Sequence, residues 1–172
     1  MDWSFLASGE APTSGACFSA CRGFRSLLWR RWAPGPWLNL VMLNPSRADE
    51  VRNDPTIARA VRRARLLGYG GLLATNLFSA CATDPRALTR LPDPVGPEND
   101  EAILQAAAAA HRVICAWGIH GRLGERGVTV ETLLRRAGHP LWVLRLNSDG
   151  SPAHPLYLGY ALDPRPWPSS RH

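Results

Sequence analysis

The sequence contains no lysine. All 20 of its basic residues are arginines, against 14 acidic residues, which gives a net charge of +6 and a pI near 9.9. The exclusive use of arginine, together with abundant alanine, glycine and proline, is typical of a GC-rich coding sequence. The excess of positive charge is independent of that bias. Because a guanidinium group pairs with phosphate through a planar fork, the charge favours an anionic partner such as DNA or a nucleotide.

Long apolar runs and metal-binding cysteine spacings are also missing. No stretch approaches the ~20 apolar residues that span a bilayer, and the first residues lack the basic-then-apolar order of a secretory signal. We therefore expect a cytoplasmic protein without a membrane partner. The four cysteines show no CxxC spacing, so we expect neither a zinc site nor a disulfide framework, and we predict no cofactor. The oligomeric state stays open.

The length and composition predict one domain. A chain of 172 residues that is 45% hydrophobic is long enough for one core and too short for two. We expect this domain over residues 17–162. A flexible lead-in rich in Gly, Ser, Ala and Pro precedes it at 1–16, and a proline-rich irregular tail follows at 163–172.

Short apolar runs separated by helical patterns indicate an α/β fold. The runs are Trp37–Leu43, Gly71–Thr75, Val113–Ala116 and Leu141–Leu146. Such runs are typical of buried parallel strands. Helices are expected at about Pro55–Leu67, Asp100–His111 and Val130–Ala137. For the first helix, Asp54 is the predicted N-cap and Pro55 the first helical residue.

Two arginine-rich segments each allow two interpretations. Phe24–Trp32 is aromatic and cationic, and the turn residues 33–36 separate it from the next run, which predicts an N-terminal edge hairpin. Its charges either protect an edge strand or, with the tryptophans, form a surface for a nucleic-acid backbone. The arginines of the helix at 55–67 are either a solvated face or a phosphate site.

Polar residues stand where the predicted strands end. The segments are Leu43-Asn44-Pro45-Ser46, Thr75-Asn76-Leu77, Ala116-Trp117-Gly118-Ile119 and His154-Pro155-Leu156-Tyr157. Ligands of open α/β sheets bind beyond the carboxyl ends of the strands, so we expect these segments to line one pocket. Each also has an ordinary structural explanation. Asparagine caps turns, tryptophan packs sheet ends, and a lone histidine is more often structural than catalytic.

A set of short motifs resembles the bacterial and phage domain-of-unknown-function family numbered 1643. The motifs are Gly15-Ala16-Cys17-Phe18-Ser19, Leu43-Asn44-Pro45-Ser46-Arg47-Ala48-Asp49, Asp54-Pro55-Thr56-Ile57, Gly68-Tyr69-Gly70-Gly71, Asn76-Leu77-Phe78, Ala82-Thr83-Asp84-Pro85, Gly96-Pro97-Glu98-Asn99-Asp100, Ala116-Trp117-Gly118 and His154-Pro155-Leu156-Tyr157-Leu158. The resemblance covers residues 15 to 160 and implies no activity.

The order of the polar segments is also similar to the uracil-DNA glycosylase superfamily, whose members cleave the bond between a flipped base and its deoxyribose. This resemblance implies a three-layer α/β/α sandwich with a mostly parallel four-stranded central sheet. It implies that Asn44 positions the attacking water, that Asn76 reads the base, and that His154 stabilises the departing base. The further substrate-binding residues that we expect are Pro45, Ser46, Phe78, Trp117, Gly118, Leu156 and Tyr157.

The general base has two interpretations, because an amide is a poor base compared with a carboxylate. Asp49 or Asp54 could supply the carboxylate instead. The leading hypothesis is excision of a damaged or modified base from DNA. The alternatives are a non-catalytic module that binds a nucleotide or nucleic acid, an enzyme that acts on free nucleotides, and an interaction domain whose polar segments are only turns.

Overall fold

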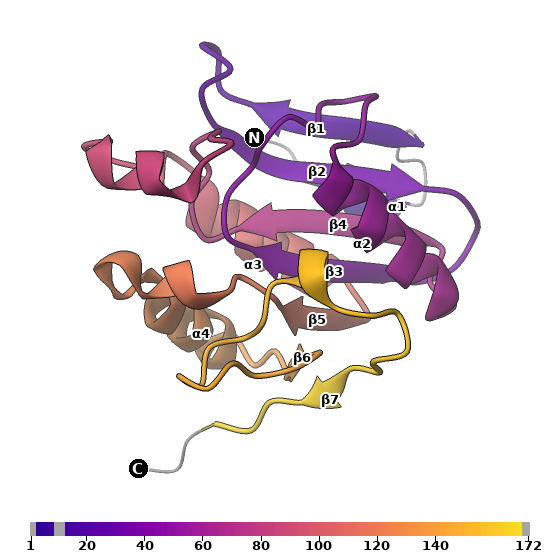
Figure 1. Ribbon diagram of the computed structural model, residues 1–172. Helices are drawn as coiled ribbons and strands as arrows, with labels where there is room; N and C mark the ends of the chain where they lie inside the picture. Colours follow the sequence, from indigo (N-terminus) through magenta and orange to yellow (C-terminus); the bar gives the residue numbers. More distant parts are fainter. Residues whose placement is uncertain (1–2, 9–12, 170–172) are drawn as a thin grey trace.

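The computed structural model describes residues 3–8 and 13–169. Within them the chain forms one seven-stranded sheet in the order β1-β2-β4-β3-β5-β6-β7 (Figure 1). The strands are β1 (Ser14–Phe18), β2 (Arg25–Arg31), β3 (Trp37–Met42), β4 (Gly71–Asn76), β5 (Arg112–Cys115), β6 (Leu141–Val143) and β7 (Arg165–Pro166).

The four strands in the middle of the order, β4, β3, β5 and β6, run parallel to one another, and each overlaps one of the four predicted segments. A four-stranded sheet is nevertheless wrong for the whole molecule. An antiparallel pair, β1 and β2, extends the sheet on the β4 side, and β7 extends it antiparallel to β6. The fold is therefore a mixed α/β fold around a parallel centre.

The helices are α1 (Phe5–Ser8), α2 (Pro55–Leu66), α3 (Asn99–Ala109) and α4 (Arg126–Arg136), with 3₁₀ turns η1 (Pro85–Arg90), η2 (Ile119–Glu125) and η3 (Pro155–Tyr157). Three of the helices, α2, α3 and α4, lie near their predicted places, and α1 was not predicted. Helix α2 begins as predicted: Asp54 is its N-cap and accepts the backbone N–H of Ile57, and Pro55 is its first residue.

Side chains that alternate along β3 divide the core between the two faces of the sheet. Leu38 and Leu40 pack in one apolar cluster with Ile57 of α2. Val41 packs in another with Ile103 of α3 and with residues of α4. Helix α2 thus covers one face, and α3 and α4 cover the other.

The predicted edge hairpin has different members from those expected. Strand β2 pairs with β1 and β4, and its expected partner, the run at Trp37–Leu43, pairs with β4 and β5. The hairpin at the sheet edge is β1 with β2. Arg25 and Arg30 of β2 are buried, so they neither protect an edge nor form a nucleic-acid surface.

Parts of both terminal segments are ordered, contrary to expectation. Helix α1 and the start of β1 lie in the expected lead-in, and β7 lies in the expected tail; residues 1–2, 9–12 and 170–172 of these segments are outside the described part. Cys17, Cys21, Cys81 and Cys115 are free thiols. Within residues 3–8 and 13–169, no helix has the length and apolar character that a membrane crossing requires.

Candidate functional site

The carboxyl ends of the parallel strands stay together after the strands end. Met42 and Asn76 are register partners at the ends of β3 and β4. Beyond them, Leu77 donates its backbone N–H to Met42 over 2.8 Å, and Phe78 donates to Leu43 over 3.0 Å. The chain segments that follow β3 and β4 are therefore fixed side by side.

His154 is brought to this same edge. Gly118, three residues beyond the end of β5, donates its backbone N–H to Pro152 over 2.8 Å. A β-carbon added to Gly118 would lie 3.4 Å from Cβ of His154. Gly118 has a φ of +78°, a conformation that favours glycine. The turn after β5 thus places His154 at the carboxyl edge, as the sequence predicted for these two residues.

The environment of His154 keeps its imidazole neutral. Burial lowers the pKa of His154 to about 4, although the nearby Asp54 carboxylate opposes the shift. Its Nδ1 accepts the backbone N–H of Leu156 over 3.3 Å and so caps η3. A neutral imidazole with an accepting Nδ1 carries its proton on Nε2. His154 can therefore donate a hydrogen bond without carrying a charge.

Asn44 is half-buried and uses its amide nitrogen to join two loops. Its Nδ2 donates to the carbonyl oxygens of Pro45 at 2.9 Å and Ala82 at 2.7 Å. Its Oδ1 makes no hydrogen bond within the described part of the chain. Nδ2 of Asn44 therefore caps the turn, which is the ordinary structural explanation. Oδ1 can accept a hydrogen bond from water or a ligand.

Asn76, the last residue of β4, is 1% exposed. Leu72 and Ala74 lie in the cluster under α2, so the alternation of the strand puts Asn76 on that same face. Its Oδ1 is buried and makes no hydrogen bond in the described part of the chain. A buried carbonyl without a partner is costly, which makes Asn76 a candidate for ligand recognition.

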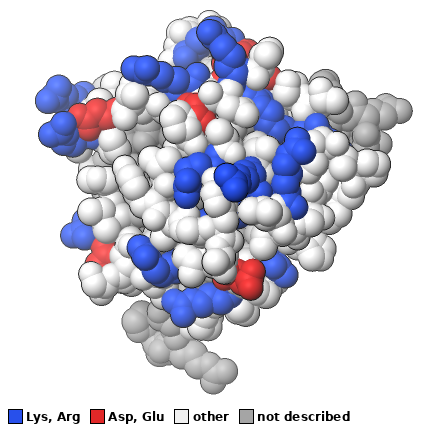
Figure 2. Space-filling view, turned by 45° about the vertical axis from the view of Figure 1, so that its right-hand side comes forward, with Lys and Arg blue, Asp and Glu red and all other residues white. Residues whose placement is uncertain are grey.

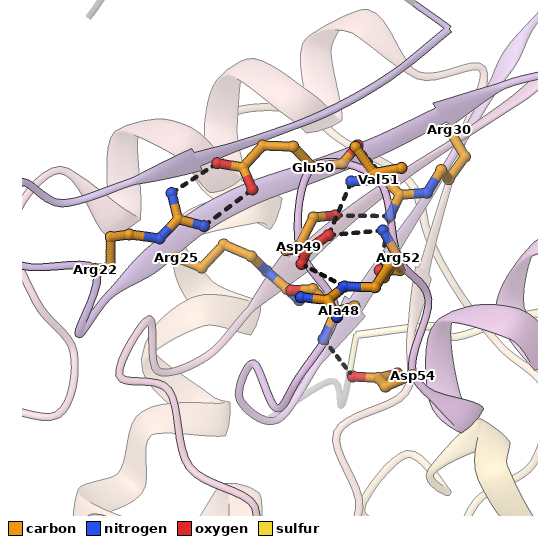
Figure 3. Close-up of polar contacts among 9 residues, drawn as sticks. All are labelled: Arg22, Arg25, Arg30, Ala48, Asp49, Glu50, Val51, Arg52 and Asp54. Carbon is orange, nitrogen blue, oxygen red and sulfur yellow. Dashed lines mark hydrogen bonds and ion pairs between the residues drawn. The ribbon is translucent and has the colours of Figure 1, made fainter.

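The two candidate carboxylates are engaged by the loop that leads into α2. Asp49 accepts the backbone N–H groups of Val51 and Arg52, which lower its pKa to about 2. Asp54 accepts the N–H groups of Arg47, Ala48 and Ile57. Figure 3 shows these carboxylates turned into their own loop. Their contacts are those of capping groups, and neither presents the unoccupied carboxylate that a general base needs.

Phe78 and Trp117 do not join His154, which corrects the prediction for both. Each is 3% exposed, and both pack in the cluster that α3 and α4 cover. Trp117 lies edge-on to Trp167 with ring centroids 5.8 Å apart. Both aromatic rings fill the core on the face of the sheet opposite α2, so neither can stack on a ligand beside His154.

The remaining predicted residues lie beside Asn44 or His154. Pro45 is buried and Ser46 is half-buried in the turn after β3. Leu156 is half-buried, whereas Tyr157 is 83% exposed at the end of η3. Tyr157 is thus the large side chain that stands free next to His154.

Two buried arginines of β2 support the site, and sequence reasoning missed this role. Arg25 donates to the carbonyl oxygen of Ala48 over 2.7 Å, and burial lowers the pKa of Arg25 to about 10. Arg30 donates to the carbonyl oxygens of Asp49 and Arg52. Figure 3 shows both guanidinium groups under the loop between Asn44 and α2. The available signal was a pair of arginines within an apolar strand, where a charge needs internal partners.

A cavity of about 210 Å³ is lined by residues that include Trp117, Arg122, Asp149 and Trp167. Asn44, Asn76 and His154 do not line this cavity. In the described residues, no three His, Cys, Asp or Glu side chains are grouped so that they could hold a metal ion.

Fold and site define an α/β protein with polar groups gathered at the carboxyl edge of a parallel sheet. The chain belongs to the family DUF1643, which is described as "protein of unknown function". The model of this family matches residues 25–156. This confirms the first resemblance. No curated protein and no solved structure matches the chain.

Proposed function

We propose that the protein binds a nucleobase of DNA at the carboxyl edge of its sheet and hydrolyses the N-glycosidic bond of that base. The observation that carries the proposal is the neutral His154, which lies against Gly118 with its Nδ1 already occupied. Further support comes from the order of Asn44, Asn76 and His154 along a parallel sheet with helices on both faces, which is similar to the three-layer arrangement of the uracil-DNA glycosylases.

In this mechanism His154 acts on the leaving group. When the bond between C1′ of the sugar and the base nitrogen breaks, the electron pair stays with the base, and negative charge develops on a carbonyl oxygen of the base. The Nε2–H of His154 donates a hydrogen bond to that oxygen. A preorganised donor in a site with little water stabilises such charge strongly. A neutral imidazole suits this task, because it keeps its proton after donating the hydrogen bond.

Asn44 orients the water. As the sugar becomes an oxocarbenium-like cation, a water oxygen adds to C1′ and its proton passes to the departing base or to solvent. The products are a free base and a sugar hydroxyl, so the reaction balances with water alone. Nδ2 of Asn44 is fixed by Pro45 and Ala82, and Oδ1 accepts one hydrogen of the water. The cation attracts the water, which makes a strong base unnecessary.

Asn76 reads the edge of the base. Its buried Oδ1 accepts an N–H of the bound base and so gains the partner that it lacks in the free protein. An analogue without that N–H leaves the carbonyl unpaired. A site built in this way discriminates strongly against such an analogue.

The test is incubation of the protein with labelled oligonucleotides that carry uracil, hypoxanthine, or oxidised or hypermodified bases, followed by alkaline cleavage at abasic sites. We expect one class of base to be excised, with activity lost in His154→Ala and reduced in Asn44→Ala. His120→Ala is the matched control, because His120 is an exposed histidine in η2. Absence of cleavage on the whole panel would overturn the proposal.

A second candidate function is binding of a nucleotide without catalysis. The engaged carboxylates of Asp49 and Asp54 favour it, because they leave no evident general base at the site. In that case nucleotide binding, measured by calorimetry, should survive His154→Ala and Asn44→Ala together, with no turnover by the wild type.

A further inference from the structure

Helix α2 has a cationic surface that acidic residues do not neutralise. The helix carries Arg59, Arg62 and Arg65 and also the buried Arg63, and it contains no Asp or Glu. The ion pairs in the described part of the chain involve arginines elsewhere, at 22, 52, 86, 122, 126 and 135. The four arginines of α2 are therefore neighbours of one sign.

The spacing of these arginines brings their charges together. Arg59 is three residues before Arg62 and four before Arg63, and Arg62 is three before Arg65. Side chains at these separations are neighbours on a helix, and like charges there destabilise it. Neighbouring positive charges of this kind destabilise the protein when it is free, and a bound anionic partner relieves the repulsion between them.

Two aromatic rings hold the guanidinium groups in place. The ring of Tyr160 has the guanidinium carbons of Arg59, Arg62 and Arg63 at 4.7, 4.6 and 5.3 Å from its centroid. Arg65 lies 4.7 Å above Trp32. Guanidinium groups that stack on aromatic faces keep their N–H edges available for phosphate.

The four arginines divide into two pairs. Arg59 and Arg63 both donate to the carbonyl oxygen of Leu158, and thereby anchor the segment that follows His154. Arg62 and Arg65 are exposed, and their side chains make no hydrogen bond within the part of the chain that the structure describes. Arg62 and Arg65 are thus the arginines free to bind a ligand.

We infer that Arg62 and Arg65 of α2 bind the phosphates of a DNA strand, so that the substrate is a polymer rather than a free nucleotide. The inference rests on the proposed function, which identifies the site beside helix α2 as a site of base excision. The N-cap residue of helix α2, Asp54, lies close to His154. From Arg62 to Arg65 the helix rises about 4.5 Å, and a DNA strand rises about 3.4 Å per nucleotide, so the two guanidinium groups can reach neighbouring phosphates. Figure 2 shows basic side chains gathered in the middle of this face of the molecule.

The test is binding of a fluorescent oligonucleotide, followed by anisotropy over a series of salt concentrations. The variant is Arg62→Ala with Arg65→Ala. The matched control is Arg90→Ala with Arg136→Ala, which removes two exposed arginines from η1 and α4 and makes the same change in net charge. We expect the α2 variant to bind about tenfold more weakly, with a salt slope shallower by about 2. The control should match the wild type.

The inference fails if the α2 variant keeps the affinity and salt slope of the wild type. It also fails if the wild type binds no oligonucleotide, or binds a nucleoside monophosphate as tightly as the strand. Base excision is scored separately. Loss of strand binding in the α2 variant without any excision by the wild type would support the inference and overturn the proposed function. Excision that the α2 variant performs normally would do the opposite.

Discussion

His154 lies directly against Gly118, where an added β-carbon would come within 3.4 Å of Cβ of His154. Gly118 turns the chain just after β5 with a φ of +78°. The contact joins the end of a central strand to a segment far along the chain. It is the structural relationship on which the position of the imidazole depends.

Replacement of Gly118 by alanine should therefore disturb both backbone and site. A side chain at this φ is strained, and we expect Gly118→Ala to lower the free energy of unfolding by about 1 to 3 kcal/mol. The added methyl group should also shift the NMR signals of His154 and reduce base excision. Gly138→Ala is the control, since Gly138 has a φ of +84° with open space around it. Equal effects of the two variants on excision would contradict the role of the contact.

The stability of the protein should depend on pH through His154. The ordinary pKa is 6.5, and burial lowers it to about 4 in the folded state. Between these values the unfolded state binds the extra proton and the folded state does not. The contribution of the neutral His154 to the free energy of unfolding is therefore complete above pH 6.5. It is lost as the pH drops toward 4, and the loss amounts to roughly 3 kcal/mol.

Urea unfolding of the wild type and His154→Gln at several pH values between 7 and 4.5 tests this dependence. The variant should lose less stability over that range. Asp49 and Glu50, whose pKa values are lowered to about 2, lose their contribution as the pH falls through their ordinary values of 3.8 and 4.5, at the lower end of this window and equally in both proteins. Parallel stability curves for the two proteins would show that His154 is not held neutral.

Arg25 should matter more for stability than Arg22, although both approach the same loop. Arg25→Met leaves the buried carbonyl of Ala48 unpaired, and we expect a loss of about 1 to 3 kcal/mol in the free energy of unfolding. Arg22→Ala breaks an exposed ion pair with Glu50 and the stacking of Arg22 on the ring of Phe18, and it should have little effect. Hydrogen exchange at the amides of Val51 and Arg52 should quicken in the first variant only. Similar exchange rates in both variants would contradict this difference.

Asp54 should act as a structural cap. Asp54→Ala leaves the N–H groups of Arg47, Ala48 and Ile57 without their acceptor, and should lower the free energy of unfolding by about 2 kcal/mol. Asp54→Asn should recover much of the loss. Asp84→Ala, at the exposed cap of η1, should cost less. If Asp54→Asn remains stable but abolishes excision, Asp54 has a chemical role beyond capping.

Local patterns predicted the parallel strands and the start of α2, because burial and capping are written in neighbouring residues. The partner of β2 was not predictable in the same way. Pairing of β2 with β1 and β4 depends on contacts between distant segments, and the short turn at 33–36 suggested the wrong neighbour.

The site shows the same limit. Polar residues at strand ends predicted that Gly118 and His154 lie at one edge of the sheet, and the structure brings these two residues together. The pattern could not say on which face a side chain would lie. Trp117 and Gly118 are adjacent, yet the indole packs on the α4 face while Gly118 contacts His154. The buried arginines escaped notice because their partners are backbone carbonyls, which no sequence pattern reveals.

The central claim is that His154 stabilises a base as it leaves DNA. The most direct measurement is the single-turnover rate of free-base release from a modified oligonucleotide, followed by mass spectrometry for the wild type, His154→Ala and His120→Ala. The account predicts release by the wild type and by His120→Ala. In His154→Ala it predicts a release rate that is reduced by about 100-fold or more. Release at the wild-type rate in His154→Ala, or no release by the wild type, would contradict it.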